Sequence, residues 1–179
     1  PYSTLEKFIS SDDVVYKVYN TNNPGMIFSW GKLDVDATGF GYDLMRHSKA
    51  FFCASSELIG LYDEGNDLRF SRYYDKYDFN NYDEGIFYVA TKNYCKASTA
   101  NEAYDQALRL EEAYLNRAEA YIEKGEHELG MDDVNAIRAE RIKGEYELVA
   151  NSVDEAREFY RLEKRLEFSF EGLRWFDIR

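Results

Sequence analysis

The stretch from Glu163 to Arg179 holds the residues whose types and spacing could do chemistry. Glu167 and Glu171 are four residues apart, so they are neighbours on one face of a helix. Two carboxylates about 5–10 Å apart are the catalytic pair of glycoside hydrolases. Each of these glutamates, however, has an arginine or lysine close in sequence that would keep it ionised, whereas a general acid needs a raised pKa. We therefore expect no catalytic residue in this stretch.

We interpret the same stretch as a structural network, because the planar guanidinium of arginine binds carboxylates through two hydrogen bonds. Glu112 and Glu119, on an expected helix further upstream, are the predicted carboxylate partners of Arg165 or Arg174. The network would fix the last helix to that upstream helix. Its expected members are Glu119, Arg165, Glu167, Glu171, Gly172, Arg174, Trp175 and Asp177.

Composition argues against several other kinds of site. The net charge of −12 leaves no basic patch for nucleic acid or for anionic lipid. The sequence has no phosphate-binding glycine loop, no Ser/His/Asp order and no zinc-ligand spacing. The turn 63–67 offers oxygen ligands but lacks the spacing of an EF-hand. We expect neither a metal nor a cofactor, and we interpret Cys53 and Cys95 as buried small hydrophobic residues, with a single disulfide left open.

Aromatic residues make up 17% of the chain, with 16 Tyr, 12 Phe and 2 Trp. Tyrosine and tryptophan present large, stiff faces at low entropic cost, and sugar rings stack on such faces. Rings in polar, turn-rich surroundings are therefore candidates for ligand binding, with packing in the core as the alternative for each. The candidates are Trp30, Phe40, Tyr42, Tyr73, Tyr74 and Tyr77, of which Trp30 and Tyr42 are the first to test.

All six candidate rings lie in residues 1–100, where the sequence shows no regular pattern of apolar and polar residues. Both prolines and most turn-like clusters lie there. Short strands are predicted at Val14–Tyr19, Met26–Trp30 and Phe87–Lys92, and a short helix opened by a serine cap at Ser55–Tyr62. We expect this half to be the ligand side.

Residues 101–179 are predicted to be a helical repeat part with three helices, at about 103–124, 128–142 and 153–171. Apolar residues recur at helical spacing on the first two helices. They are Ala107, Leu110, Tyr114, Leu115, Ala118, Tyr121, Ile122, Met131, Val134 and Ile137. The first two helices form a hairpin of tetratricopeptide type, whose small Ala118 and Gly130 allow close approach. One such unit cannot bury both of its faces, so the third helix is expected to cover it.

Four segments in order resemble the markers of the SusD/RagB family. They are Leu61–Arg69 (an Asp-x-Arg turn), Leu110–Tyr121 (a Tyr-Leu-x-Arg-Ala-Glu-Ala helix), Asp133–Arg138 (an Asn-x-x-Arg helix) and Glu163–Arg179 (a Phe-Glu-Gly-x-Arg-Trp-x-Asp turn). Lys164 and Leu173 depart from the pattern, where the family usually has Arg and often His.

This resemblance implies a mainly α, SusD-like fold and a single domain over residues 1–179, as part of a longer protein. It further implies a non-enzymatic lipoprotein at the outer-membrane surface that binds a nutrient, usually an oligosaccharide. Such a protein acts with a SusC-like TonB-dependent transporter, and its lipid anchor would lie outside this chain. Two alternatives stay open: a helical-repeat adaptor that binds only protein, and a glycoside hydrolase.

Overall fold

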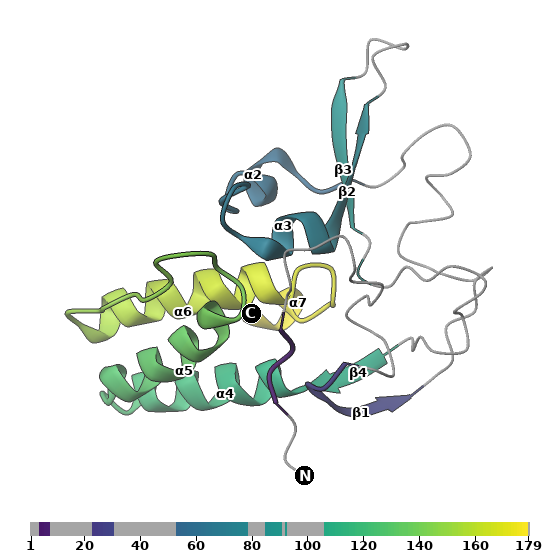
Figure 1. Ribbon diagram of the computed structural model, residues 1–179. Coiled ribbons are helices and arrows are strands. Elements are labelled where there is room, and N and C mark those ends of the chain that lie inside the picture. Colours follow the sequence, from purple (N-terminus) through teal and green to yellow (C-terminus); the bar gives the residue numbers. More distant parts are fainter. Residues whose placement is uncertain are drawn as a thin grey trace.

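The computed structural model describes residues 4–7, 23–30, 53–78, 85–90, 92 and 106–178. The fold is mainly α, with short strands, as predicted (Figure 1). The elements in chain order are β1 (Met26–Trp30), α2 (Ser56–Ile59), α3 (Leu68–Tyr73), β2 (Tyr74–Asp78), β3 (Ile86–Ala90), β4 (Gln106–Arg109), α4 (Leu110–Glu123), α5 (His127–Ala139), α6 (Val153–Glu167) and α7 (Arg174–Asp177).

The long helices α4, α5 and α6 pack side by side and enclose the main hydrophobic core (Figure 1). The predicted apolar stripes face inward, since Leu115, Ala118 and Ile122 of α4 and Val134 and Ile137 of α5 are buried. The amphipathic helix α6 adds its own buried face to them. The predicted hairpin and its covering third helix are thus confirmed.

Gly130 sets the distance between α4 and α5. A Cβ atom at this position would lie 2.5 Å from Cγ1 of Ile122 and 2.9 Å from the carbonyl oxygen of Ala118. Such contacts are far below van der Waals separation, so no larger residue fits without displacing a helix. The predicted role of a small residue here is confirmed.

The start of α6 follows the prediction, but its end does not. The Ser152 hydroxyl accepts a hydrogen bond from the Glu155 backbone N–H at 3.2 Å, as an N-cap does. Helix α6 ends at Glu167, four residues before the predicted end. The chain then turns through positive φ angles at Phe170 (62°) and Gly172 (79°), which no helix continues through.

The first long helix begins later than predicted. The segment Gln106–Arg109 is strand β4 instead of helix, and it pairs antiparallel with β1, with Phe28 opposite Leu108. The predicted helix from about residue 103 is therefore wrong at its start. Local periodicity did not reveal the pairing, because the partner strand lies about 80 residues earlier in the chain.

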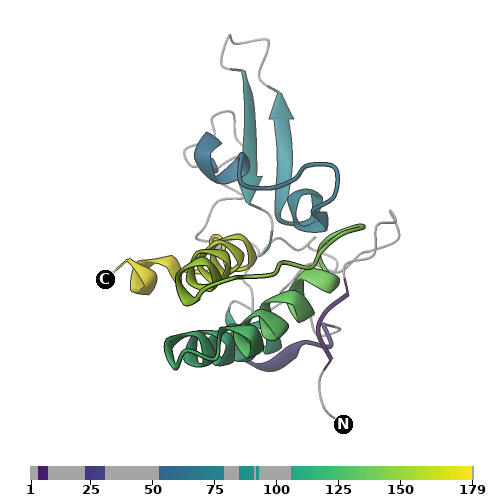
Figure 2. The same ribbon diagram turned by 90° about the vertical axis from the view of Figure 1, so that its left-hand side faces the viewer.

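A second core lies above the helices, where α2 and α3 meet the hairpin of β2 and β3. It is formed by Tyr62, Phe70, Tyr73, Tyr74 and Leu166, the last of which belongs to α6. The hairpin extends away from the helical layer in both views (Figures 1 and 2).

The short predicted elements have mixed outcomes. Strands β1 and β3 and helix α2 confirm three of them, and the Ser55 hydroxyl caps α2 by accepting from the Leu58 N–H. The predicted strand Val14–Tyr19 lies outside the described residues. Cys53 is exposed as a free thiol, so the interpretation of it as buried is wrong, and Cys95 is also outside the described residues.

Candidate functional site

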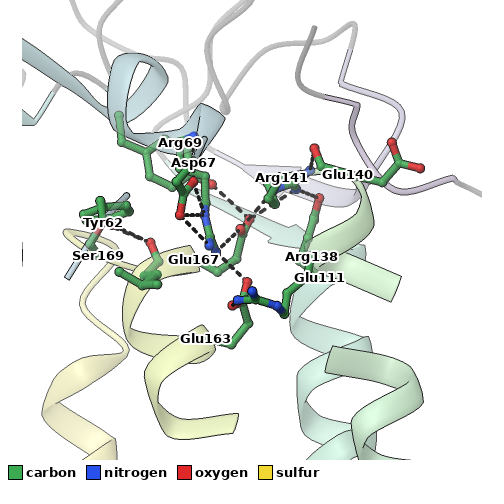
Figure 3. A network of polar contacts seen from close by, with 12 residues as sticks. Tyr62, Asp67, Arg69, Glu111, Arg138, Glu140, Arg141, Glu163, Glu167 and Ser169 are labelled. Atoms are coloured by element: carbon green, nitrogen blue, oxygen red, sulfur yellow. Dashed lines mark hydrogen bonds and ion pairs between the residues drawn. The ribbon is translucent and has the colours of Figure 1, made fainter. Parts of the chain in front are cut away.

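The C-terminal end of α6 meets a buried network of ion pairs between the two cores (Figure 3). Glu167 is its centre and is fully buried. Its carboxylate accepts hydrogen bonds from Arg141 Nε and Arg109 Nη1, both at 3.0 Å, and from the Tyr73 hydroxyl at 3.0 Å. Arg69 Nη1 lies 3.4 Å from the same carboxylate. Residues from three other segments (α3, β4 and the stretch after α5) thus converge on one side chain.

Arg69 joins this centre to the turn before α3. Its Nε and Nη2 atoms donate to both oxygens of Asp67, at 2.9 and 2.8 Å, in the bidentate geometry. Its Nη1 donates to Glu163 at 2.6 Å, and Arg138 donates to the other oxygen of Glu163 at 3.1 Å. Asp67 also caps α3, because its carboxylate accepts from the Arg69 backbone N–H. The Asp67–Arg69 pair therefore fixes the start of α3, and Arg69 connects it to α6 through Glu163.

Arg141 and Arg109 extend the network toward α4 and the C-terminal turn. Arg141 Nη2 donates to Glu111 at 2.7 Å, and Arg109 Nη1 lies 3.2 Å from the other Glu111 oxygen. Arg109 Nη2 donates to Glu171 at 2.8 Å, and Lys92 Nζ donates to the same carboxylate at 2.8 Å. Glu171 thereby holds the turn after α6 against β4.

The charges of the network compensate one another. Removing a charge from water is costly unless an opposite charge and hydrogen bonds replace the solvent. Here every cation contacts at least one carboxylate and every carboxylate at least one cation. The members are Arg69, Lys92, Arg109, Arg138 and Arg141 with Asp67, Glu111, Glu163, Glu167 and Glu171.

The arginines keep the central carboxylates ionised. Burial alone would raise the pKa of Glu167, but the charges of Arg141, Arg109 and Arg69 outweigh burial and hold this pKa well below its usual range. For Glu171, burial is likewise outweighed by Arg109 and Lys92, and its pKa is lowered. Neither carboxylate carries a proton to give at neutral pH. This pair therefore lacks the protonated partner that a glycoside hydrolase requires.

Glu6 is a further buried carboxyl at the edge of the network. It accepts a hydrogen bond from the Asn23 side-chain amide at 3.0 Å, and Arg141 donates to the Glu6 backbone carbonyl. Burial raises the pKa of Glu6 to about 7, although the charges of Arg141 and Arg109 oppose this rise. The Glu6 carboxyl thus has a pKa close to neutral, and burial also lowers the pKa of Lys92 in the network, to about 8.

The sequence model of the SusD family matches residues 16–179. The chain belongs to the SusD family. A crystal structure of a SusD-like protein from Bacteroides fragilis has the same fold, with a TM-score of 0.63 and 22% sequence identity. The match covers 89% of this chain and 43% of that one, so the chain spans less than half of that protein's length. No curated protein matches the chain.

The other predicted structural residues of this SusD-family chain have different partners from those expected. Arg165 pairs with Glu57 at 2.8 Å, and Glu119 accepts from the Tyr160 hydroxyl at 2.6 Å. Arg174 is exposed and forms no ion pair with a described residue. The predicted pairing of Arg165 or Arg174 with Glu112 or Glu119 is wrong. Gly172 lies in the turn, as expected.

Near that turn, Asp177 binds Lys164 at 2.7 Å, and Trp175 is 59% exposed. These two members of the predicted set therefore lie outside the buried network. They belong to a surface that α7 forms beside α6.

Two of the predicted ligand-binding rings lie in the second core. Tyr73 and Tyr74 are buried, and their hydroxyls donate to Glu167 and Ser169, so neither ring faces solvent. Trp30 lies in β1 and Tyr77 in β2, but the structure does not describe their side chains. Phe40 and Tyr42 lie outside the described residues. The described structure therefore brings none of these rings together at a surface.

Sequence reasoning missed the cations that bind Glu167. Arg109 stands between Leu108 and Leu110, where an isolated charge among apolar residues was a usable signal of burial. Arg69 could have been predicted from the Asp-x-Arg turn in the segment Leu61–Arg69. No feature of the neighbouring sequence marks Arg141 as buried.

No group of three or more His, Cys, Asp or Glu side chains in the described part of the chain is arranged to hold a metal ion. No helix among these residues combines the length and apolar character needed to cross a membrane.

Proposed function

We propose that the chain belongs to a non-catalytic protein that binds a glycan at the outer-membrane surface, where a lipid attaches it. The observation that carries this proposal is the match to the SusD family over residues 16–179. The protein would deliver its ligand to a SusC-like TonB-dependent transporter. The helical part with α4 and α5 would face the transporter, and residues 1–100 would form the ligand side.

The state of the carboxylates supports a role without catalysis. The side chains of Glu167 and Glu171 are enclosed, ionised and paired with arginines and Lys92, so they stabilise the fold and have no access to a substrate. We propose that Trp30, Phe40, Tyr42 and Tyr77 supply rings for sugar stacking. Tyr73 and Tyr74, which are buried, would instead pack in the second core at the base of the β2–β3 hairpin.

Calorimetric titration of the protein with a panel of neutral oligosaccharides tests the proposal. We expect saturable binding with no new reducing ends. Trp30→Ala and Tyr42→Ala should each weaken binding about tenfold while leaving the melting temperature unchanged, because stacking on a ring contributes about 1–3 kcal/mol. Tyr146→Ala is the control, since this tyrosine is 39% exposed in the helical part.

The alternatives predict other outcomes. Release of reducing ends would indicate a hydrolase, and binding of none of the sugars would favour the protein-binding adaptor. A loss of stability in Trp30→Ala or Tyr42→Ala would assign the ring to the core instead of to the ligand.

A further inference from the structure

A cleft lies on the surface beside the network, where α6 and α7 face the start of α2. Its volume is about 200 Å³, which suits one sugar ring better than an extended chain. Lys164, Arg165, Arg174 and Asp177 form its charged lining, and Ser55 and Phe170 lie among its other walls. In Figure 2 the yellow turn of α7 lies at the open edge of the molecule, next to the C-terminus.

Positive charge dominates this cleft, although the whole chain carries −12. Lys164 is engaged by Asp177 at 2.7 Å, and Arg165 by Glu57 at 2.8 Å. Arg174 is exposed and has no ion pair with any residue that the structure describes. Its planar fork of donors is therefore available to an anion from solution, and that geometry matches a carboxylate.

Phe170 provides the cleft with an aromatic wall held at a conformational cost. Its φ angle is 62°, a region that bulky residues seldom occupy, so the surrounding structure imposes this conformation. The ring packs edge-on against Tyr74, with centroids 6.1 Å apart, and it remains 37% exposed. A strained backbone that keeps a ring at a cleft points to a contact made there.

We propose that this cleft binds a hexuronate unit, the acidic sugar of an anionic glycan. The sugar carboxylate would accept hydrogen bonds from Arg174, its ring would stack on Phe170, and its hydroxyls would bond to Asp177 and Ser55. This inference rests on the proposed glycan-binding function and specifies the class of glycan. The site is separate from the predicted rings of residues 1–100.

Titrations followed by calorimetry or NMR with methyl glucuronide, methyl glucoside and acetate test the proposal. We expect methyl glucuronide to bind about tenfold more tightly than the neutral methyl glucoside, because the carboxylate adds a charge-assisted hydrogen bond. It should also bind more tightly than acetate, which has the charge without the ring. Raising the salt concentration should weaken its binding.

Variants locate the binding. Arg174→Ala should weaken methyl glucuronide about tenfold and leave methyl glucoside unchanged, since only the charged contact is removed. Phe170→Ala should weaken both sugars. Lys124→Ala, which removes an exposed cation outside the cleft, is the matched control and should change neither. The melting temperature of each variant shows whether it is folded.

Equal affinity for methyl glucuronide and methyl glucoside, or for methyl glucuronide and acetate, would overturn the proposal, as would unchanged glucuronide binding in Arg174→Ala. If neutral oligosaccharides bind in a Trp30- or Tyr42-dependent way while the glucuronide tests fail, only this inference is lost. If no sugar of either kind binds, the proposed function fails as well.

Discussion

Arg141 connects three parts of the molecule through one guanidinium group. It binds Glu111 of α4, Glu167 of α6 and the backbone carbonyl of Glu6. Arginine can do this because its five donors are fixed in a plane, whereas a lysine offers one point of charge. The side chain is fully buried, so water could not take its place as hydrogen-bond donor to these partners.

Arg141→Ala should therefore lower the free energy of unfolding by about 3–5 kcal/mol, because it leaves buried carboxylates without their cation. Urea denaturation measures this change. Arg157→Ala is the control, since that arginine pairs with exposed Glu123 and Asp154, and such pairs contribute at most about 1 kcal/mol. Similar losses in the two variants would show that the network is hydrated and weak.

The Glu6 carboxyl gives the protein a specific dependence on pH. Its pKa is about 7 in the folded protein against 4.5 for the unfolded chain, so only the folded protein holds this proton between those values. The free energy of unfolding must then decrease as pH rises through this window, by at most about 3 kcal/mol. The charged groups that act on it include Arg141, Arg109, Glu111 and Glu167, and also Arg72.

Glu6→Gln tests this dependence, because glutamine keeps the oxygen that accepts from Asn23 but has no proton to lose. Denaturation curves at pH 4.5–7.5 should show a decline in the natural protein and a flatter profile in the variant. Below pH 4.5 both should lose stability, since the unfolded chain then binds protons at Glu167 and Glu171, while their lowered pKa values keep these groups ionised in the folded protein. The same decline in both proteins would exclude Glu6 as its cause.

At the scale of helices and strands, local pattern predicted what local interactions determine. The stripes of α4 and α5, the Ser152 cap and the small Gly130 all follow from residues close in sequence. The start of α4 could not be predicted in this way, because Gln106–Arg109 becomes a strand only by pairing with Met26–Trp30. For the same reason helical spacing could not predict that Arg165 pairs with Glu57.

Gly130→Ala should destabilise the protein by about 1–3 kcal/mol, because the added methyl group would overlap Ile122 and the Ala118 carbonyl. In an unobstructed helix the same change stabilises by up to about 1 kcal/mol, so the sign of the effect is diagnostic. Gly65→Ala is the control, since a Cβ there meets only Asp63 Oδ1 at 3.5 Å. A stabilised Gly130→Ala variant would mean that α4 and α5 are further apart than described.

At the scale of the whole molecule, the network joins two hydrophobic cores. One lies between α4, α5 and α6, and the other beneath the β2–β3 hairpin. Leu166 and Tyr73 lie at the junction, next to Glu167. The markers in the sequence indicated the family and the fold and contain Arg69 and Arg138, but Lys92, Arg109 and Arg141 lie outside them, so the markers did not predict this junction.

We expect the two cores to unfold together. Native-state hydrogen exchange at the buried residues Val89 of β3 and Val134 of α5 should report the same opening free energy. In Arg141→Ala the opening free energy at Val89 should decrease by a different amount from that at Val134, because the junction between the two cores is broken. A lower value at Val89 in the natural protein would show that the hairpin opens independently.

The order of the network residues along the chain has a consequence for biosynthesis. Arg69, Lys92, Arg109 and Arg141 all leave the ribosome before Glu163, Glu167 and Glu171. Domains that fold during synthesis do so from the N-terminal side as segments emerge. Here the central carboxylates arrive after every cation that they bind, so the two cores cannot be joined until α6 has been made. The nascent chain is therefore kept from joining its two cores until the segment that carries these three carboxylates has been made.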